Sequence, residues 1–353
     1  MDDEQALPLA LAVDLGGTQM RTGVLRGANL LSLVTLQTGA DRRPESMLPR
    51  AFAALEQALQ QASVTLEQVA GIGIGAPGPL DSRTGVIYTP PNMPGWEALP
   101  LRQLFEQRYR VPVYVENDAN AAALGEFLFG AGRGCQHMVY LTISTGIGGG
   151  VIADGRLLTG ASGAAAELGH MTIDWQGERC TCGNTGCLEY IASGTGIARR
   201  ASQLIQAGQG DELLAFARQL ARQEKAGNAE QGGKNGEQDG HEEERQSWVT
   251  ARVVALAAAA GVPVAQQIIE RAAEALGVGL VNIIHIFNPE KIILGGGVTQ
   301  MGPLLLEPAR RVVYERAMRA PREAVRIELA RAGPNVGLVG AGALLYYYHN
   351  TGS

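Results

Sequence analysis

The stretch Thr142–Glu189, TISTGIGGGVIADGRLLTGASGAAAELGHMTIDWQGERCTCGNTGCLE, decides how the rest of the chain is interpreted. It joins a glycine-rich turn, a Glu-x-x-His pair and three closely spaced cysteines. A glycine-rich turn lets a phosphate group approach backbone N–H groups, and thiols with an imidazole are metal ligands. The stretch therefore predicts a phosphate loop, a set of hydroxyl-binding groups and a metal site that holds these groups in place.

The cysteine spacing is the most specific of these signals. Cys180, Cys182 and Cys187 follow His170 and supply, with it, the ligand set of a closed tetrahedral zinc site that has a structural role. A disulfide, a redox couple or buried thiols without a ligand are the alternatives. Two cysteines one residue apart bond to each other only with strain, and the rest of the chain offers Cys135 alone. The spacing therefore favours zinc.

His170 also belongs to the Glu167–His170 pair. One ring nitrogen of an imidazole can hold a metal while the other donates a hydrogen bond outward. We expect the acceptor of that bond to be the substrate. Glu189 lies two residues after the last thiol, so the same metal site would anchor it, and we expect it to face the same place.

Length and composition limit the class of protein. A chain of 353 residues exceeds what one hydrophobic core usually covers, and 46% hydrophobic residues with 47 glycines favour a two-domain α/β protein. A net charge of -6 and a pI near 5.5 argue against nucleic-acid binding. The N-terminus shows no secretory signal, and the apolar runs are too short to span a membrane. We expect a cytoplasmic protein that does not bind membranes, in a compartment that keeps thiols reduced.

Two similar hairpins open the two halves of the chain. The first runs from a strand at Leu9–Val13 through Asp14, Gly16, Gly17 and Thr18 into a return strand at 20–25. The glycines would admit a phosphate, Thr18 adds a hydroxyl and Asp14 would hold Mg²⁺ through water, although an ordinary hairpin turn uses the same residues. The second hairpin carries Ser144–Gly150. Their repetition suggests a duplicated α/β domain that binds one polyphosphate from both sides.

A third polar cluster, Glu116-Asn117-Asp118, follows a strand at Val111–Val115 and precedes a strongly helix-forming segment. Asp118 would then be the N-cap of that helix, or a general base at the carboxyl end of a strand, where α/β proteins bind ligands, or both. Asn92 lies in a loop whose amide either binds a polar ligand or is satisfied locally. The run GIGIGA at 71–76 is no dinucleotide fingerprint, because two prolines follow it.

The remaining patterns predict the other elements. Helices are expected at 44–62, 190–204, 248–260, 263–286 and 337–348, and strands at 69–75, 288–294 and 325–329. Gly295–Gly297, after a strand, would admit the flat face of an adenosine or would form a tight turn. Residues 226–246 contain no aliphatic side chain larger than alanine, so we expect a flexible insertion there.

Taken in order, these motifs resemble the ROK sugar kinases and their repressor relatives, within the actin/hexokinase/Hsp70 superfamily. The resemblance covers nearly the whole chain outside 226–246, and it rests on six segments: 14–18, 117–120, 144–150, 167–170, 180–189 and 295–298. One departure is Ala166, where relatives usually carry glycine before the glutamate. The resemblance implies two actin-like (ribonuclease H-like) α/β domains with an interdomain cleft. Residues 1–117 would form the first, with a C-terminal helix at about 338–353 packing back on it, and 118–337 the second, with its zinc knot at 170–187.

The resemblance also implies a reaction, in which Asp118 takes the proton from a sugar hydroxyl as the γ-phosphoryl group of ATP arrives. Residues that would bind the sugar are Gly78, Asn92, Asn117, Asp118, Glu167, His170 and Glu189. Residues that would bind ATP and Mg²⁺ are Asp14, Gly16, Gly17, Thr18, Thr145, Gly146, Gly148, Gly296 and Gly297. The sequence is most similar to glucokinases, with N-acetylmannosamine, N-acetylglucosamine, fructose and mannose kinases as alternatives, and a homodimer is expected. The repressor relatives carry a winged helix-turn-helix ahead of this fold; with a first strand at Leu9 we expect none here.

Overall fold

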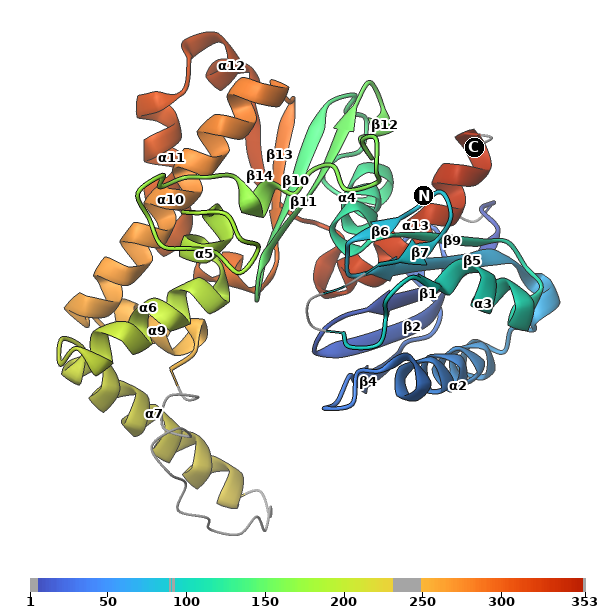
Figure 1. Cartoon of the computed structure of the whole chain (residues 1–353), viewed down its shortest axis with the longest axis horizontal. Coiled ribbons are helices and arrows are strands. Elements are labelled where there is room, and N and C mark those ends of the chain that lie inside the picture. Colours follow the sequence, from blue (N-terminus) through green and yellow to red (C-terminus); the bar gives the residue numbers. More distant parts are fainter. Residues whose placement is uncertain (1–5, 89, 91–92, 231–248, 352–353) are drawn as a thin grey trace.

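The computed structural model describes residues 6–88, 90, 93–230 and 249–351 and contains two large β-sheets with helices around and between them (Figure 1). Two large clusters of buried apolar side chains accompany the two sheets, one from residues 9–115 and the other from residues 139–317. Each half of the chain therefore has a hydrophobic core of its own.

The first sheet has the strand order β3-β2-β1-β5-β9, with β4 pairing with β2. Its strands are β1 Leu9–Leu15, β2 Gln19–Arg26, β3 Asn29–Leu30, β4 Val34–Gln37, β5 Val69–Ala76 and β9 Val113–Asn117. β1 and β2 form an antiparallel hairpin, whereas β1, β5 and β9 run parallel. Parallel pairing aligns Asp14 with Gly75 and Ala76 with Asn117, so the carboxyl ends of the three strands meet at one edge.

The second sheet repeats this arrangement in the order β12-β11-β10-β13-β14. Its strands are β10 Met138–Ile143, β11 Ile147–Ala153, β12 Arg156–Leu157, β13 Lys291–Gly295 and β14 Arg326–Leu329. Again an antiparallel hairpin, β10–β11, is followed by parallel strands. A small third sheet consists of β6 Leu80–Asp81, β7 Val86–Ile87 and β8 Leu99–Pro100. The two hairpins predicted from the sequence are both present.

Most helices cover the outer faces of the two sheets, and α4 and α13 lie between the sheets (Figure 1). The helices are α2 Pro44–Ala62, α3 Leu101–Tyr109, α4 Asp118–Phe129, α5 Leu188–Ala192, α6 Gly194–Gln206, α7 Asp211–Glu230, α9 Ala251–Ala259, α10 Pro263–Phe287, α11 Pro303–Arg316, α12 Arg319–Ala324 and α13 Val336–Thr351. Short 3₁₀ turns are η1 Leu66–Gln68, η2 Leu168–His170, η3 Gly297–Met301 and η4 Gly333–Asn335. No single described helix combines the length and apolar character of a membrane span, although α9 and α10, bent by 116° at their break, meet that test as a pair.

Glycines allow α4 and α13 to touch. A Cβ at Gly125 of α4 would lie 3.0 Å from the Cα of Gly340 in α13, and a Cβ at Gly340 would overlap the carbonyl oxygen of Ala121. On its other side α13 meets β5, where a Cβ at Gly73 would overlap the carbonyl oxygen of Ala341. The last helix therefore packs against the first sheet.

Two sequence expectations are wrong in detail. The single helix expected at 190–204 is two helices, α5 and α6, because Ser193 adopts an extended backbone and its hydroxyl oxygen accepts the N–H of Gly196 at 3.0 Å, which starts a new helix. The expected insertion begins too early, because helix α7 continues to Glu230; residues 231–246 lie outside the described part of the chain.

Candidate active site

The candidate catalytic residue, Asp118, is the first residue of α4, directly after β9. Its carboxylate oxygen Oδ1 accepts the N–H of Ala119 at 2.8 Å. The N-cap of the helix is Asn117 instead, whose Oδ1 accepts the N–H groups of Ala119 at 2.9 Å and Asn120 at 3.3 Å. Asp118 is therefore not the cap that the sequence suggested, and its second oxygen, Oδ2, makes none of these backbone contacts.

Two further carboxylates share the electrostatic environment of Asp118. Burial, together with the weaker effects of the charges of Asp14 and Glu167, raises the pKa of Asp118 to about 6. Burial also raises the pKa of Asp14 to about 6, against the opposing effect of Arg21. The charges of Asp14 and Glu167 therefore both act on the carboxyl group of Asp118.

Arg21 was missed by the sequence analysis. Its Nη1 lies 3.7 Å from Oδ2 of Asp14, and the two residues face each other across the β1–β2 hairpin. Counting outward from the predicted turn pairs Asp14 with Arg21, so the strand register was the signal that could have identified it.

Glu116 was quoted in the sequence analysis without a role. The side chain is fully buried, and its Oε1 accepts the N–H of Asn117 at 2.9 Å and the Nδ2 group of Asn120 at 3.1 Å. Its Oε2 accepts the hydroxyl of Tyr348 at 3.1 Å. Burial raises its pKa, and these hydrogen bonds lower it. Glu116 therefore holds the turn on which Asn117 and Asp118 stand.

The first glycine turn joins β1 to β2 and follows Asp14. A Cβ at Gly16 would lie 2.5 Å from the carbonyl oxygen of Gln19, so the turn requires glycine there, whereas nothing lies within 4 Å of a Cβ at Gly17. The hydroxyl of Thr38 donates to the carbonyl oxygen of Gly16 at 2.7 Å and holds the turn. Gly17 and Thr18 are both exposed, next to Asp14 at the end of β1.

The second glycine turn is held by Glu189, whose Oε2 accepts the N–H of Ile147 at 2.8 Å. The hydroxyl of Thr195 donates to the carbonyl oxygen of Thr145 at 2.7 Å. Gly146 lies directly against the Glu189 carboxylate, and a Cβ at Gly148 would lie 2.8 Å from the Cβ of Ala119 in α4. Glu189 therefore joins the predicted substrate site to the predicted nucleotide turn.

The third glycine segment follows β13. Gly296 has φ of 89°, and a Cβ there would overlap the carbonyl oxygen of Ile143 at the end of β10. Nothing lies within 4 Å of a Cβ at Gly297. The turn thus brings an open backbone segment beside the Ser144–Gly150 hairpin.

Glu167 and His170 belong to one short turn. The N–H of His170 donates to the carbonyl oxygen of Glu167 at 3.0 Å, and Ala166 has φ of 65° in the left-handed region. Glycine adopts that conformation without the steric cost that alanine meets. Burial raises the pKa of Glu167, the charge of His170 lowers it and the charge of Glu189 raises it.

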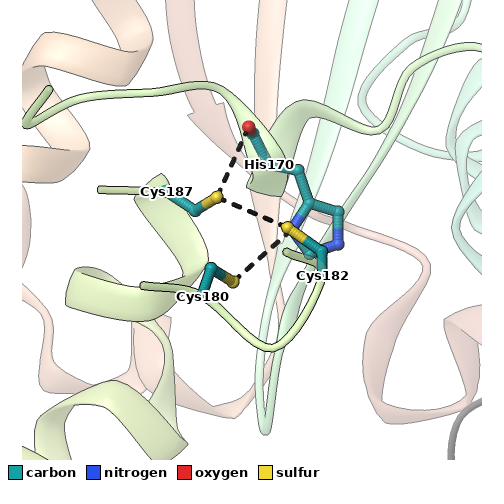
Figure 2. A group of neighbouring side chains, drawn as sticks. All are labelled: His170, Cys180, Cys182 and Cys187. Carbon is teal, nitrogen blue, oxygen red and sulfur yellow. Dashed lines mark hydrogen bonds between the residues drawn. The ribbon is translucent and has the colours of Figure 1, made fainter. Parts of the chain in front are cut away.

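The predicted metal ligands converge (Figure 2). One ligand atom from each of His170, Cys180, Cys182 and Cys187 lies within 4.8 Å of the others. The sulfurs of Cys182 and Cys187 are 3.7 Å apart, and Nδ1 of His170 is 4.0 Å from the sulfur of Cys180. Tetrahedral zinc with bonds of about 2.3 Å to sulfur and 2.0–2.1 Å to nitrogen separates its ligands by roughly these distances. The four residues therefore fit zinc, and the second ring nitrogen of His170 points away from the thiols (Figure 2).

The remaining predicted substrate ligands are placed as follows. A Cβ at Gly78 would lie 3.2 Å from Nδ2 of Asn117, so the loop after β5 meets the end of β9. Asn92 lies outside the described residues.

Two sheets of the same construction, each with a glycine hairpin, and a carboxylate at the start of α4 define an actin-like sugar kinase fold, with two domains and a cleft between them. The family model described as "ROK family" matches residues 10–347, and the chain belongs to this family.

The chain is similar to glucokinases and to a repressor. Glucokinase of Halalkalibacterium halodurans is 32% identical over 343 residues, which cover 97% of this chain and 96% of that protein. The crystal structure of a ROK family glucokinase from Streptomyces griseus in complex with glucose and AMPPNP has a TM-score of 0.76 and 33% identity, covering 95% of this chain and 98% of that one. A putative xylose repressor of Caldicellulosiruptor is 33% identical over 303 residues, covering 86% of this chain and 69% of the repressor.

Proposed function

We propose that this protein transfers the γ-phosphoryl group of ATP to glucose and forms glucose 6-phosphate. It is an ATP-dependent sugar kinase by its family and its glucokinase relatives. The choice of glucose is supported by the names of those relatives, and kinases for other hexoses are the alternative. The observation that carries the proposal is the position of Asp118 at the end of β9, with two more carboxylates nearby.

Asp118 is the proposed general base. A base works best when its pKa lies near the working pH, and a pKa of about 6 leaves the carboxylate ionised at neutral pH yet basic enough to accept the proton of a hydroxyl. Phosphoryl transfer passes through a loose transition state, so positioning and charge neutralisation matter more than covalent chemistry.

The proposed sugar site uses Asn117, Glu167 and His170, with Gly78, Glu189 and Asn92 completing it. The outward nitrogen of His170 would donate to a sugar hydroxyl. One oxygen of Glu189 already accepts the N–H of Ile147, which leaves the other for the sugar. A sugar bound there would touch the same residue that shapes the second glycine turn.

The proposed nucleotide site uses the turns at Gly16–Thr18, Thr145–Gly148 and Gly296–Gly297. Asp14 would hold Mg²⁺ through water, and the site favours a cation because three carboxylates with raised pKa values lie near one another. When bound, the ion would neutralise charge on the phosphates. Arg21, beside Asp14, is a positive charge that the protein itself supplies to offset these carboxylates.

We place the domain boundary at 117/118, with α13 returning to the first domain, because the two apolar clusters divide near that position. Closure of the domains over the sugar would exclude water, which otherwise competes as acceptor. A homodimer in the cytoplasm remains our expectation, and light scattering tests the dimer.

ADP release measured across glucose, N-acetylmannosamine, N-acetylglucosamine, fructose and mannose tests the proposal. We expect the highest kcat/KM with glucose. Asp118→Asn should reduce kcat by at least about 10²-fold while calorimetry still detects glucose binding, because the substitution removes the base and keeps the shape. A sugar-sensing regulator, to which the xylose repressor similarity points, would bind sugar without ADP release from the unaltered protein.

A further inference from the structure

A second cavity, of about 900 Å³, lies where the first sheet, the second sheet and α13 meet. It lies beside the amino-terminal part of β9, whereas Asp118 follows the carboxyl end of that strand. Its walls include Arg83, Arg102, Tyr114, Arg156, Tyr347 and Tyr348. Small-molecule sites occupy about 300–1,000 Å³, so the space suits a ligand of the size of a metabolite.

The cavity is cationic in a protein whose net charge is -6. Three guanidinium groups line it, against the carboxylate of Glu106, and one of the three, that of Arg83, pairs with Asp81 at 3.2 Å, which leaves Arg102 and Arg156 as the cations available to a ligand. Arg102 is held in place because its guanidinium donates to the carbonyl oxygens of Ser82 at 2.6 Å and Arg83 at 2.7 Å. Arg156, from β12, is exposed and makes no side-chain hydrogen bond or ion pair to any described residue. A guanidinium group matches phosphate oxygens with two N–H groups at once.

Aromatic rings line another part of the wall. The rings of Tyr114 and Tyr348 are stacked with centroids 5.5 Å apart, and Tyr347 meets Tyr348 edge to face at 5.1 Å. Such rings offer flat surfaces to a sugar or a base. We propose that this cavity binds a small organic phosphate, a phosphate group carried on a sugar or nucleoside ring.

One hydrogen-bonded chain joins this cavity to the candidate active site. Tyr348 lines the cavity and donates its hydroxyl to Glu116, at 3.1 Å. Glu116 in turn accepts the N–H of Asn117, the residue before Asp118. A ligand that moves Tyr348 therefore acts on the turn that carries the base, and its binding regulates turnover.

Calorimetry with inorganic phosphate, glucose 6-phosphate and AMP tests the site. We expect at least one organic phosphate to bind more tightly than inorganic phosphate. Tighter binding of glucose 6-phosphate would identify the ligand as a sugar phosphate, and tighter binding of AMP would identify it as a nucleoside phosphate. Arg156→Glu should weaken that binding at least tenfold, while Arg133→Glu, an exposed arginine that does not line the cavity, should leave it unchanged. Because Arg156 has no described side-chain partner to lose, the variant should fold normally.

Equal dissociation constants for Arg156→Glu and the unaltered protein with every probe would overturn the proposal, as would no binding at all. These measurements need no turnover, so they stand apart from the proposed kinase activity.

A kinetic measurement tests the regulation. The organic phosphate that binds should change the KM for sugar or the kcat of the unaltered protein at least twofold, and Arg156→Glu should lose this effect. Tyr348→Phe keeps the ring and removes the hydroxyl, so it should retain binding but lose the kinetic effect. A probe that binds through Arg156 and alters neither kinetic constant would show that the link to Glu116 is wrong.

Discussion

At the scale of single residues, the shared charge of Asp14 and Asp118 sets how activity depends on pH. The pKa of each is raised to about 6, and the two groups repel each other, so the measured value belongs to the pair. If ionised Asp118 is the base, kcat/KM should rise about tenfold between pH 5 and pH 7 and then level off. A pH–rate profile with ADP detection measures this, and a profile that is flat from pH 5 to 7 would contradict the role of Asp118.

The same shift makes a prediction for stability. Both carboxyl groups bind protons more tightly in the folded protein than in the unfolded chain, so their contribution to the free energy of unfolding is largest below pH 4 and declines as the pH rises through 6. The change in melting temperature between pH 5 and pH 8 should therefore be smaller for Asp118→Asn than for the unaltered protein.

Ala166 is a residue whose backbone the sequence could not anticipate. Its φ of 65° costs an L-residue about 1–2 kcal/mol. Glycine avoids this steric cost but loses more conformational entropy on folding, so the substitution gains only a part of it. Ala166→Gly should thus raise the free energy of unfolding by about 0.5–1 kcal/mol in urea titrations. Ala165→Gly is the matched control, because Ala165 has no positive φ, and it should lower stability. A loss of stability in Ala166→Gly would show that the turn is not strained.

Residue types at the site were predictable, and their division of labour was not. Asn117 and Asp118 were both expected at the end of β9, yet which of them caps α4 depends on backbone angles that the sequence does not determine. Glu116 and Arg21 carry out their roles through partners far along the chain or across a hairpin, Tyr348 and Asp14. The contact of Glu116 with Tyr348 arises only when the fold is complete, whereas the pairing of Arg21 with Asp14 follows from the register of the hairpin.

At the scale of elements, the metal loop was the most predictable part of the site. Local spacing alone brings three thiols and an imidazole together, because the turns between them are short and glycine permits their shape, as at Gly186 with φ of 64°. The two hairpins were equally local. The break at Ser193 was not, because a helix-forming sequence continues on both sides of it and a single hydroxyl decides the outcome.

Removal of one thiol tests what this loop does. Cys182→Ser should fail to bind zinc, melt at a lower temperature and raise the KM for sugar about tenfold or more, because zinc held by this cluster would orient His170 and Glu189. Since the Cys182 side chain is exposed, lost packing would not account for the change. Cys135→Ser, at a buried cysteine outside the cluster, should keep its zinc. Metal analysis, thermal melting and kinetics measure the three effects; unchanged kinetics after complete removal of metal would refute the link.

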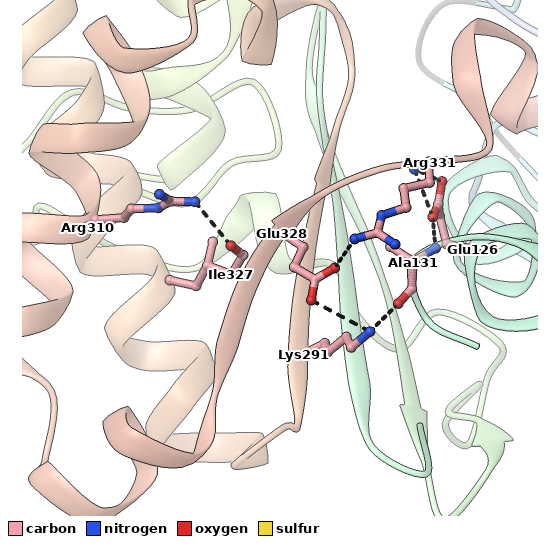
Figure 3. A network of polar contacts seen from close by, with 7 residues as sticks. All are labelled: Glu126, Ala131, Lys291, Arg310, Ile327, Glu328 and Arg331. Atoms are coloured by element: carbon pink, nitrogen blue, oxygen red, sulfur yellow. Dashed lines mark hydrogen bonds and ion pairs between the residues drawn. The ribbon is translucent and has the colours of Figure 1, made fainter. Parts of the chain in front are cut away.

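At the scale of the whole molecule, Glu126 fixes the path of the chain from the second sheet back to the first. This buried carboxylate of α4 accepts the N–H groups of Ala131 and Arg331 at 2.7–3.1 Å (Figure 3). It also accepts the N–H of Ala332 at 2.7 Å. Nearby, Lys291 and Arg331 both contact Glu328 (Figure 3). The linker between β14 and α13 is thereby tied to the helix that carries Asp118.

Glu126→Ala would leave the buried N–H group of Ala131 and the part-buried N–H groups of Arg331 and Ala332 without their acceptor. We expect the free energy of unfolding to fall by about 3 kcal/mol or more in urea titrations. Glu323→Ala is a suitable control, because Glu323 is exposed and pairs with Arg319 one helical turn away, and it should cost about 0.5 kcal/mol or less. A loss for Glu126→Ala as small as that of the control would mean that the linker is held by other contacts.

The duplicated architecture followed from the two hairpins, and the return of the last helix followed from the family resemblance. The close contact of α13 with α4 and β5 did not, because Gly73, Gly125 and Gly340 lie far apart in the sequence and each has meaning only beside the others.

The packing of α13 on the first sheet has a consequence for folding during synthesis. Ala10 and Ala12 of β1 are covered by residues 338–346, so a ribosome must translate all the residues in between before the helix that covers the first sheet emerges. Until then the apolar face of the first strands to be synthesised stays exposed to solvent, and nascent-chain chaperones shield surfaces of this kind.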